Sequence, residues 1–214
     1  MPTVIPNTQS HPELVSGSVR GKRQDKARSE MLKRVQHDVM RTKQTTTINN
    51  VYKQTDIMKL TAHFTLSEFT RSAIAETHGI DNTIPVTYIP TVKQLCDTIL
   101  EPLRAFAGQP ITISSGYRCN ALNIKAGGVY ASQHTLGEAA DIALPKTEYT
   151  SWEDNQRHTD METAHRWFNF LKEHTDFDQL ILETANGKDY WIHVSCRKNR
   201  KKNRHQVLTL KVKG

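Results

Sequence analysis

Two histidines and an aspartate, His134, Asp141 and His193, have the side chains and the surroundings that a metal site needs. His134 lies in a polar loop flanked by glycine, where its imidazole is free to face a ligand. Asp141 stands between alanine and isoleucine, and a carboxylate in such apolar surroundings must be paired or bind a metal ion. His193 interrupts an aliphatic segment in the same way. Two imidazoles and one carboxylate leave one position of a zinc tetrahedron open, as in catalytic sites.

The spacing of these three residues is weak evidence when it is taken alone. A His-x6-Asp pair with a distant histidine also arises by chance. The alternative is that each of the three groups forms its own hydrogen bonds and binds no metal. Other parts of the sequence must decide between these two interpretations.

The elements that would position these residues predict an α+β domain. Apolar residues recur at three- and four-residue spacing over 90–107, which indicates a core-facing helix, and further helices are expected over 67–77 and 161–174. A loop is expected over 115–133. Strands are predicted at 111–114, 140–144, 179–183 and 190–195. This order favours a small, mostly antiparallel sheet flanked by helices.

Charge divides the 214 residues into three parts. Residues 1–59 have a net charge of +6, residues 60–196 have −7, and residues 197–214 have +8, within a total of +7. The first part is polar and lacks apolar periodicity, so we expect a disordered basic leader with a short helical stretch over 29–35. The alternative is a basic arm that binds an acidic partner.

The C-terminal part and the overall composition exclude several classes of protein. The basic run over 197–204 is expected to be solvated, and the alternating segment over 207–212 to add an edge strand. Nucleic-acid binding is not expected, because the middle of the chain is acidic and lacks interleaved basic and aromatic residues. No run of 18 apolar residues exists, so no membrane span is expected. Three cysteines exclude a disulfide-rich scaffold, and without a visible signal peptide we expect cytoplasmic synthesis.

Four separated motifs occur in the order that is typical of one peptidase family. They are HFTLSEFTRS at 63–72, SGYR at 115–118, SQHTLGEAAD at 132–141 and WIHVS at 191–195. Residues 60–196 resemble the zinc D-Ala-D-Ala carboxypeptidase family of metallopeptidases, especially its single-domain members from phages and prophages. The resemblance implies the fold of that family for this span. It leaves residues 1–59 as the leader and residues 197–214 as a basic tail.

The resemblance also implies roles for the residues that match the motifs. His134, Asp141 and His193 match the three zinc ligands. Arg118 matches the arginine that helps to hold the substrate carbonyl or the oxyanion, a task that suits a guanidinium because it stays charged and donates directionally. The alternative for Arg118 is a salt bridge that fastens its loop.

Three further residues are candidates for substrate binding. Ser115 and Gln133 either line the site or cap their loops. Trp191 either forms the floor of a binding cleft or packs in the core, since aromatic residues favour strands.

The general base is the point at which this sequence departs from the family. Many members carry an acidic residue three positions before the last histidine ligand, but Tyr190 occupies that position here. Glu183 is the preferred base, because its strand is expected beside that of His193; the alternative is an exposed strand-end acid. Asp189 is expected to serve the turn. If neither acid reaches the metal site, the protein binds zinc and turns over slowly or not at all.

The resemblance implies zinc-dependent hydrolysis of a peptide bond in peptidoglycan stem peptides, by a carboxypeptidase or an endopeptidase that uses a metal-activated water. Glu183 would accept the water proton, and Arg118 would stabilise the oxyanion. The alternative is a non-catalytic module that binds a cell-wall peptide on the same fold, which Tyr190 favours. The basic tail is expected to attract anionic wall polymers, and release to the wall to follow a phage-type route.

Overall fold

The structure is a computed structural model that describes residues 29–31, 33–34, 36–37, 40–41 and 58–212. The chain divides into two units, Met1–Tyr52 and Lys53–Gly214. In the first unit the described residues between 29 and 41 are helical and exposed, in agreement with the short helix expected there. Residues 42–57 lie outside the described residues, as do residues 1–28, so the disorder of the leader remains a prediction. Its last two residues already contact the domain: the carbonyl of Met58 accepts from the N–H of Leu66, and Lys59 pairs with Thr65.

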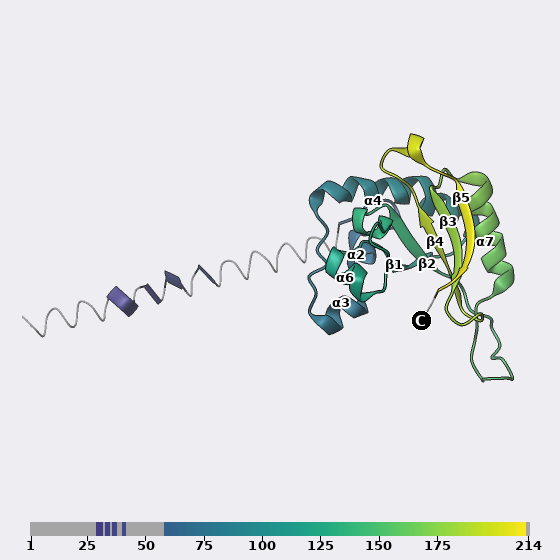
Figure 1. Ribbon diagram of the computed structural model, residues 1–214, viewed down its shortest axis with the longest axis horizontal. Helices are drawn as coiled ribbons and strands as arrows, with labels where there is room; N and C mark the ends of the chain where they lie inside the picture. Colours follow the sequence, from purple (N-terminus) through teal and green to yellow (C-terminus); the bar gives the residue numbers. More distant parts are fainter. Residues whose placement is uncertain (1–28, 32, 35, 38–39, 42–57, 213–214) are drawn as a thin grey trace, which may run out of the picture. The chain divides into compact units, whose positions relative to one another are not determined.

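The second unit combines short helices with one five-stranded sheet, which confirms the α+β class (Figure 1). The α-helices are α2 (Leu66–Thr70), α3 (Ala73–His78), α4 (Ile89–Leu95), α5 (Glu101–Ala107), α6 (Asn120–Lys125) and α7 (Met161–His174). Short 3-10 helices are η1 (Val86–Tyr88), η3 (Gln133–Leu136) and η4 (Arg200–Lys202), and a π-helix, η2 (Cys96–Leu100), joins α4 to α5. The strands are β1 (Thr112–Ser115), β2 (Ala139–Ala143), β3 (Gln179–Thr184), β4 (Tyr190–Ser195) and β5 (Gln206–Lys211).

The sheet has the strand order β1-β2-β4-β3-β5. Every neighbouring pair is antiparallel except β3 and β5, which are parallel, so the mostly antiparallel sheet is confirmed. Asp141 pairs with His193, His193 with Ile181, and Ile181 with Leu208. Paired residues point to the same face, so these four side chains form one row across the sheet.

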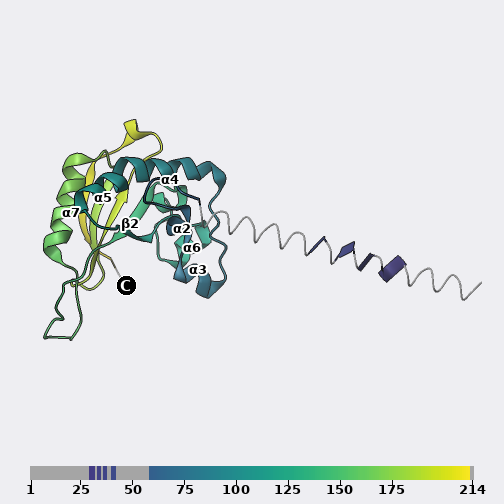
Figure 2. The same cartoon turned by 180° about the vertical axis from the view of Figure 1, so that it is seen from behind.

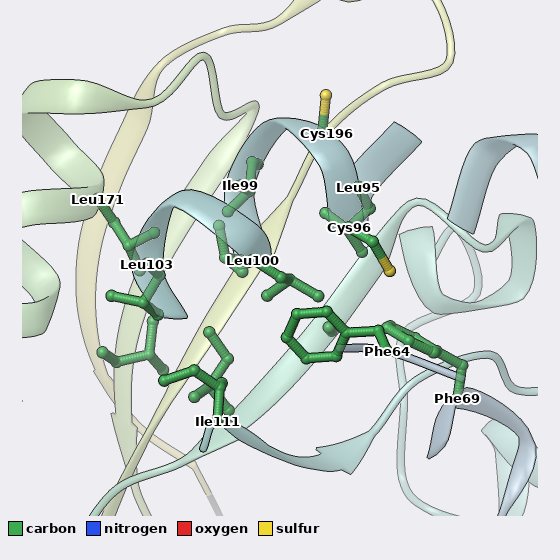
Figure 3. Close-up of a cluster of buried hydrophobic side chains, with 14 of the residues drawn as sticks. Phe64, Phe69, Leu95, Cys96, Ile99, Leu100, Leu103, Ile111, Leu171 and Cys196 are labelled. Atoms are coloured by element: carbon green, nitrogen blue, oxygen red, sulfur yellow. The ribbon is translucent and has the colours of Figure 1, made fainter. Parts of the chain in front are cut away.

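The opposite face of the sheet carries the hydrophobic core. Helices α4, α5 and α7 lie against it (Figures 1 and 2). Because side chains alternate along a strand, the neighbours of Asp141 and His193 face these helices and are fully buried: Ala140, Ile142, Ile192 and Val194. Figure 3 shows the helical side of this core, where the Phe64 ring lies near Leu100 and Cys96, and Leu103 lies near Leu171 and Ile111. The alternation therefore separates a packed face from a face that is free for chemistry.

The predicted helix over 90–107 is one continuous helical run with a π-helical interruption. The N–H of Glu101 donates to the carbonyl of Cys96, five residues earlier. Pro102 follows in the first turn of α5, and proline cannot donate to the preceding turn and crowds the carbonyl four residues before it. The wider turn gives the helix a way to pass this proline.

The structure corrects two local predictions, the single helix over 67–77 and the loop over 115–133. The helix expected over 67–77 is broken into α2 and α3, because Ser72 is extended and its hydroxyl accepts a hydrogen bond from the N–H of Ala75, which starts a new helix. The loop expected over 115–133 contains α6 and the start of η3. Helix α6 has only six residues, too few to show apolar periodicity.

The basic run after residue 196 is largely exposed, as expected, but two of its arginines, Arg197 and Arg204, are also anchored to the domain by one buried carboxylate. The side chain of Asp178 is completely buried. It accepts hydrogen bonds from Nε of Arg197 at 2.8 Å and from the main-chain N–H of Arg204 at 2.9 Å. Strand β5 then pairs with β3, which confirms the edge strand predicted at 207–212. Within the described part of the chain, no helix has the length and apolar content to cross a bilayer.

Candidate metal centre

Three side chains from three elements converge on the open face of the sheet. His134 comes from η3, Asp141 from β2 and His193 from β4. His134 Nε2 lies 3.2 Å from both His193 Nδ1 and Asp141 Oδ1, and the latter two atoms are 2.9 Å apart. A tetrahedral zinc ion with bonds of about 2.0–2.2 Å separates its ligands by about 3.4 Å, so this triangle needs little expansion to hold one. The donor set and its geometry therefore fit a metal ion, and all three residues are almost completely buried.

A backbone carbonyl orients the first of these ligands. His134 Nδ1 lies 2.6 Å from the carbonyl oxygen of Gly116. A carbonyl oxygen only accepts, so Nδ1 carries a proton, and Nε2 is the ring nitrogen left to bind a metal ion. Gly116 is required here, because a Cβ atom at this position would lie 2.6 Å from the Cα of Phe69. The SGYR loop thus touches α2 and fixes the tautomer of His134 at the same point.

Arg118 binds the second oxygen of the aspartate. One terminal nitrogen of its guanidinium donates to Asp141 Oδ2 at 2.7 Å, and its Nε donates to Ser115 Oγ at 2.8 Å. Burial raises the pKa of Asp141, but the contacts with His134 and His193 outweigh it and hold that pKa well below its usual range. Asp141 is therefore an anion that already has a hydrogen-bonded outer partner, as metal-binding carboxylates commonly do.

The two candidate bases differ in environment. Glu183 on β3 is half-buried and pairs with Trp191 on β4, two residues before His193. Burial raises the pKa of Glu183, and the negative charge of Asp141 adds to that rise. Asp189 instead lies in an ion pair with Lys146 at 2.5 Å, and this contact lowers its pKa. A carboxylate with a raised pKa is the better proton acceptor, so the environment favours Glu183.

An open cleft of about 720 Å³ surrounds the three ligands. Arg118 and Glu183 both line it, as do Gln133 and Trp191, two of the three predicted substrate-binding residues. Ser115 contacts Arg118, while its neighbour in β1 reaches the cleft. The structure therefore brings the sequence-predicted residues into one site, in which Ser115 contacts the site through Arg118 and does not line the cleft itself.

Asn82, which the sequence analysis did not single out, holds the loop that carries Arg118. The side chain of Asn82 donates to the carbonyl of Tyr117 at 2.9 Å and accepts from the N–H of Cys119 at 2.8 Å, so it holds the main chain on both sides of Arg118. Asn82 is almost completely buried. In the sequence it stands in a polar stretch after a glycine, where it resembles an ordinary turn residue.

Comparison with known proteins agrees with this geometry. A family described as Peptidase M15 matches residues 62–178, more than half of the chain. The matched span includes His134, Asp141 and Arg118 and ends before the strands that carry Glu183 and His193. A search of curated proteins finds no match. The family match confirms the resemblance found in the motifs, and the chain belongs to the Peptidase M15 family of metallopeptidases.

Proposed function

We propose that this protein is a zinc-dependent peptidase that cleaves a peptide bond in peptidoglycan stem peptides. The observation that carries the proposal is the triangle of His134 Nε2, His193 Nδ1 and Asp141 Oδ1, with edges of 2.9–3.2 Å inside the cleft. Two neutral imidazoles and one carboxylate are the donor set of hydrolytic zinc sites that leave a position for water. The family match supports the peptidase class, and the resemblance of the motifs supports the stem-peptide substrate.

The chain supplies two functions beside the ion, a base and a positive charge. When bound, zinc acidifies a water molecule and polarises the scissile carbonyl. Glu183 would accept a proton from the attacking water and pass it to the leaving amine, a role that its raised pKa favours. Arg118 provides positive charge for the developing oxyanion, and its hydrogen bonds to Ser115 and Asp141 hold it in place. The proposal covers both carboxypeptidase and endopeptidase activity.

A non-catalytic module that binds a cell-wall peptide is the second candidate. The observation in its favour is Tyr190, which stands where many family members carry an acid. Its hydroxyl donates to the carbonyl of Gly187 in the β3–β4 turn at 3.3 Å. If Glu183 does not act as the base, the same cleft binds the peptide and leaves it intact.

Zinc content and hydrolysis, measured together on three proteins, separate these functions. The three proteins are wild type, His134→Ala and Glu183→Gln, each purified without a metal-binding tag. Each is analysed for zinc and then incubated with a muropeptide mixture, with and without a chelator. We expect about one zinc per chain in wild type and in Glu183→Gln, and none in His134→Ala. We expect wild type to cleave, His134→Ala to show no cleavage, and Glu183→Gln to lose about a hundred- to ten-thousandfold in kcat.

Matched controls keep the interpretation clear. His165→Ala and Glu162→Gln change exposed residues of α7 on the far side of the sheet, and should leave zinc and activity unchanged. Wild type that takes up no zinc, even when zinc is supplied and the excess removed, would contradict the proposal. Zinc-loaded wild type that binds muropeptides without cleaving them would establish the binding module instead.

We also propose that exposed lysines of the C-terminal segment attract anionic wall polymers. Lys198, Lys201 and Lys202 are exposed, whereas Arg197 and Arg204 are engaged by Asp178. Such attraction weakens as salt rises. Pelleting with cell walls across a salt series should therefore fall in Lys201→Gln/Lys202→Gln, and unchanged pelleting would contradict the idea. These substitutions are preferable to truncation, because truncation removes β5 from the sheet.

A further inference from the structure

Strand β5 presents apolar side chains to the same cleft as the metal ligands. Leu208, Leu210 and Val212 line the cleft, together with Ile181 from β3. Leu208 pairs with Ile181, and Ile181 pairs with His193, so the apolar side chains continue the row that contains the metal ligands. Beside the metal ligands of β2 and β4, the cleft therefore has an apolar patch on β3 and β5, which we call the β5 shelf: Ile181, Leu208, Leu210 and Val212.

The shelf is rigidly held although it adds little to the core. No residue of β5 is buried, and Leu210 is 41% exposed. The strand is nevertheless paired with β3 along its whole length, and the buried Asp178 holds Arg204 just before it begins. Exposed leucines that adjoin one another on a fixed strand form a surface that gains free energy when a ligand covers it.

We infer that the β5 shelf is a substrate subsite that binds an uncharged aliphatic side chain of the peptide; this inference rests on the proposed function. Neighbouring strands lie about 4.8 Å apart, so Leu208, two strands from His193, is about 10 Å from the ligand row. An extended peptide spans about 3.3 Å per residue. The shelf therefore receives the side chain about three residues from the scissile bond.

The charge beside the shelf limits which side chain fits. Glu183 pairs with Leu210 in the register of β3 and β5. An anionic side chain on the shelf would lie next to this carboxylate and would repel it, whereas an aliphatic side chain covers the leucines without a charge conflict. The subsite thus selects for apolar character and against acidic residues.

Peptide pairs that differ at one position test the subsite. Substrates carry either leucine or glutamine three residues from the scissile bond, on either side, and are cleaved by wild type, Leu208→Gln, Leu210→Gln and Val207→Gln. Val207 is the matched control, because it is 38% exposed on the other face of the same strand. We expect wild type to prefer leucine about tenfold in kcat/KM on one side of the bond, through KM. Leu208→Gln and Leu210→Gln should remove most of this preference, and Val207→Gln should retain it.

A binding measurement distinguishes failure of this inference from failure of the proposed function. Calorimetry measures the binding of the same peptides without turnover when the protein carries Glu183→Gln. This substitution is combined with the wild-type shelf, with Leu210→Gln or with Val207→Gln, and the affinities for the leucine and glutamine peptides are compared. The subsite is overturned, even if cleavage occurs, when the leucine and glutamine peptides have equal KM and equal affinity. It is also overturned when Leu210→Gln and Val207→Gln have equal effects. A leucine preference in binding that Leu210→Gln removes, with no cleavage by wild type, supports the subsite and rejects the hydrolase.

Discussion

Asp141 and Asp178 are both buried aspartates that pair with arginine, yet their surroundings differ in kind. Asp178 is enclosed by Arg197, Arg204 and a backbone N–H, all of which donate hydrogen bonds to it. Asp141 binds one arginine through one oxygen, and its other oxygen faces the nitrogens of two imidazoles. The first carboxylate is completely satisfied by the chain, whereas the second forms one corner of a donor triangle.

This difference separates a structural ion pair from a metal centre. Arginine cannot lose its proton or ligate a metal, so a carboxylate surrounded only by arginine and N–H groups has no further chemistry. Neutral imidazoles do ligate metals, and three converging donors leave a common point for an ion. Substitutions at the two aspartates should therefore affect different properties of the protein.

The largest effect is expected at the metal centre. Asp141→Asn removes the anionic donor, so zinc content should fall from about one per chain to near zero. Hydrolysis of muropeptides should fall at least about a thousandfold, equivalent to about 4 kcal/mol of transition-state stabilisation. Elemental analysis and product quantification by mass spectrometry measure both. Full zinc occupancy in Asp141→Asn would show that the triangle is not the metal site.

The corresponding change at the structural aspartate should affect folding. Asp178→Asn leaves two arginines without their anion, and we expect a loss of about 2–3 kcal/mol in the free energy of unfolding, less than for a fully buried pair because both arginines are partly exposed. Urea denaturation measures it. Asp176→Asn is the control, since its pair with Arg200 is more exposed and should contribute below about 1 kcal/mol. Zinc content that falls with Asp178→Asn in the folded protein would contradict the separation.

Acid should weaken the structural pair in a defined range. Burial raises the pKa of Asp178, but hydrogen bonds from Arg204 and Arg197 outweigh it and lower the pKa to about 2 from its usual 3.8. The unfolded chain therefore takes up this proton at higher pH than the folded protein does. The stabilisation is fully present above about pH 5, and on the order of 2 kcal/mol is lost as pH falls toward 2. Asp178→Asn should flatten this part of the stability–pH curve, and an unchanged slope would argue against the pair.

The smallest effect is expected behind the metal centre. Ser115→Ala removes the acceptor of Arg118 Nε but leaves the bond from Arg118 to Asp141. We expect kcat to fall by at most about tenfold, with zinc content unchanged, because an outer hydrogen bond orients the guanidinium without binding the ion. Steady-state kinetics on a single muropeptide measure it. A loss as large as that of Asp141→Asn would place Ser115 in the site itself.

The two aspartates were not equally predictable from the sequence. Asp141 is conspicuous because it interrupts an apolar strand, and the motif resemblance links it to His134 and His193. That Asp141 lies beside His193 depends on the register of β2 and β4, which the alternation of side chains does not specify. Asp178 has no such local signal, because its partners lie 19 and 26 residues away and appear in the sequence only as a basic run.

The fold shows the same division between periodic and short-range signals. Strands β2, β3 and β4 are predictable from short apolar segments, and α7 from its helical spacing. Helix α6 was missed because only two of its six residues are buried. The edge strand β5 was predicted, but its parallel pairing with β3 was not. The direction of β5 depends on where the chain enters it, and that point is set by the contacts of Arg197 and Arg204 with Asp178.

The position of Val212 has a practical consequence for how this protein is prepared. Val212 lines the cleft, and its N–H donates to the carbonyl of Thr184 at the end of β3. The last described residue is therefore at the cleft, so a segment added to the C-terminus would be attached within two residues of it. A C-terminal polyhistidine tag would bring extra imidazoles within reach of the metal ligands and competing side chains over the β5 shelf. A purification handle that is cleaved off after use would keep both metal content and substrate selectivity interpretable.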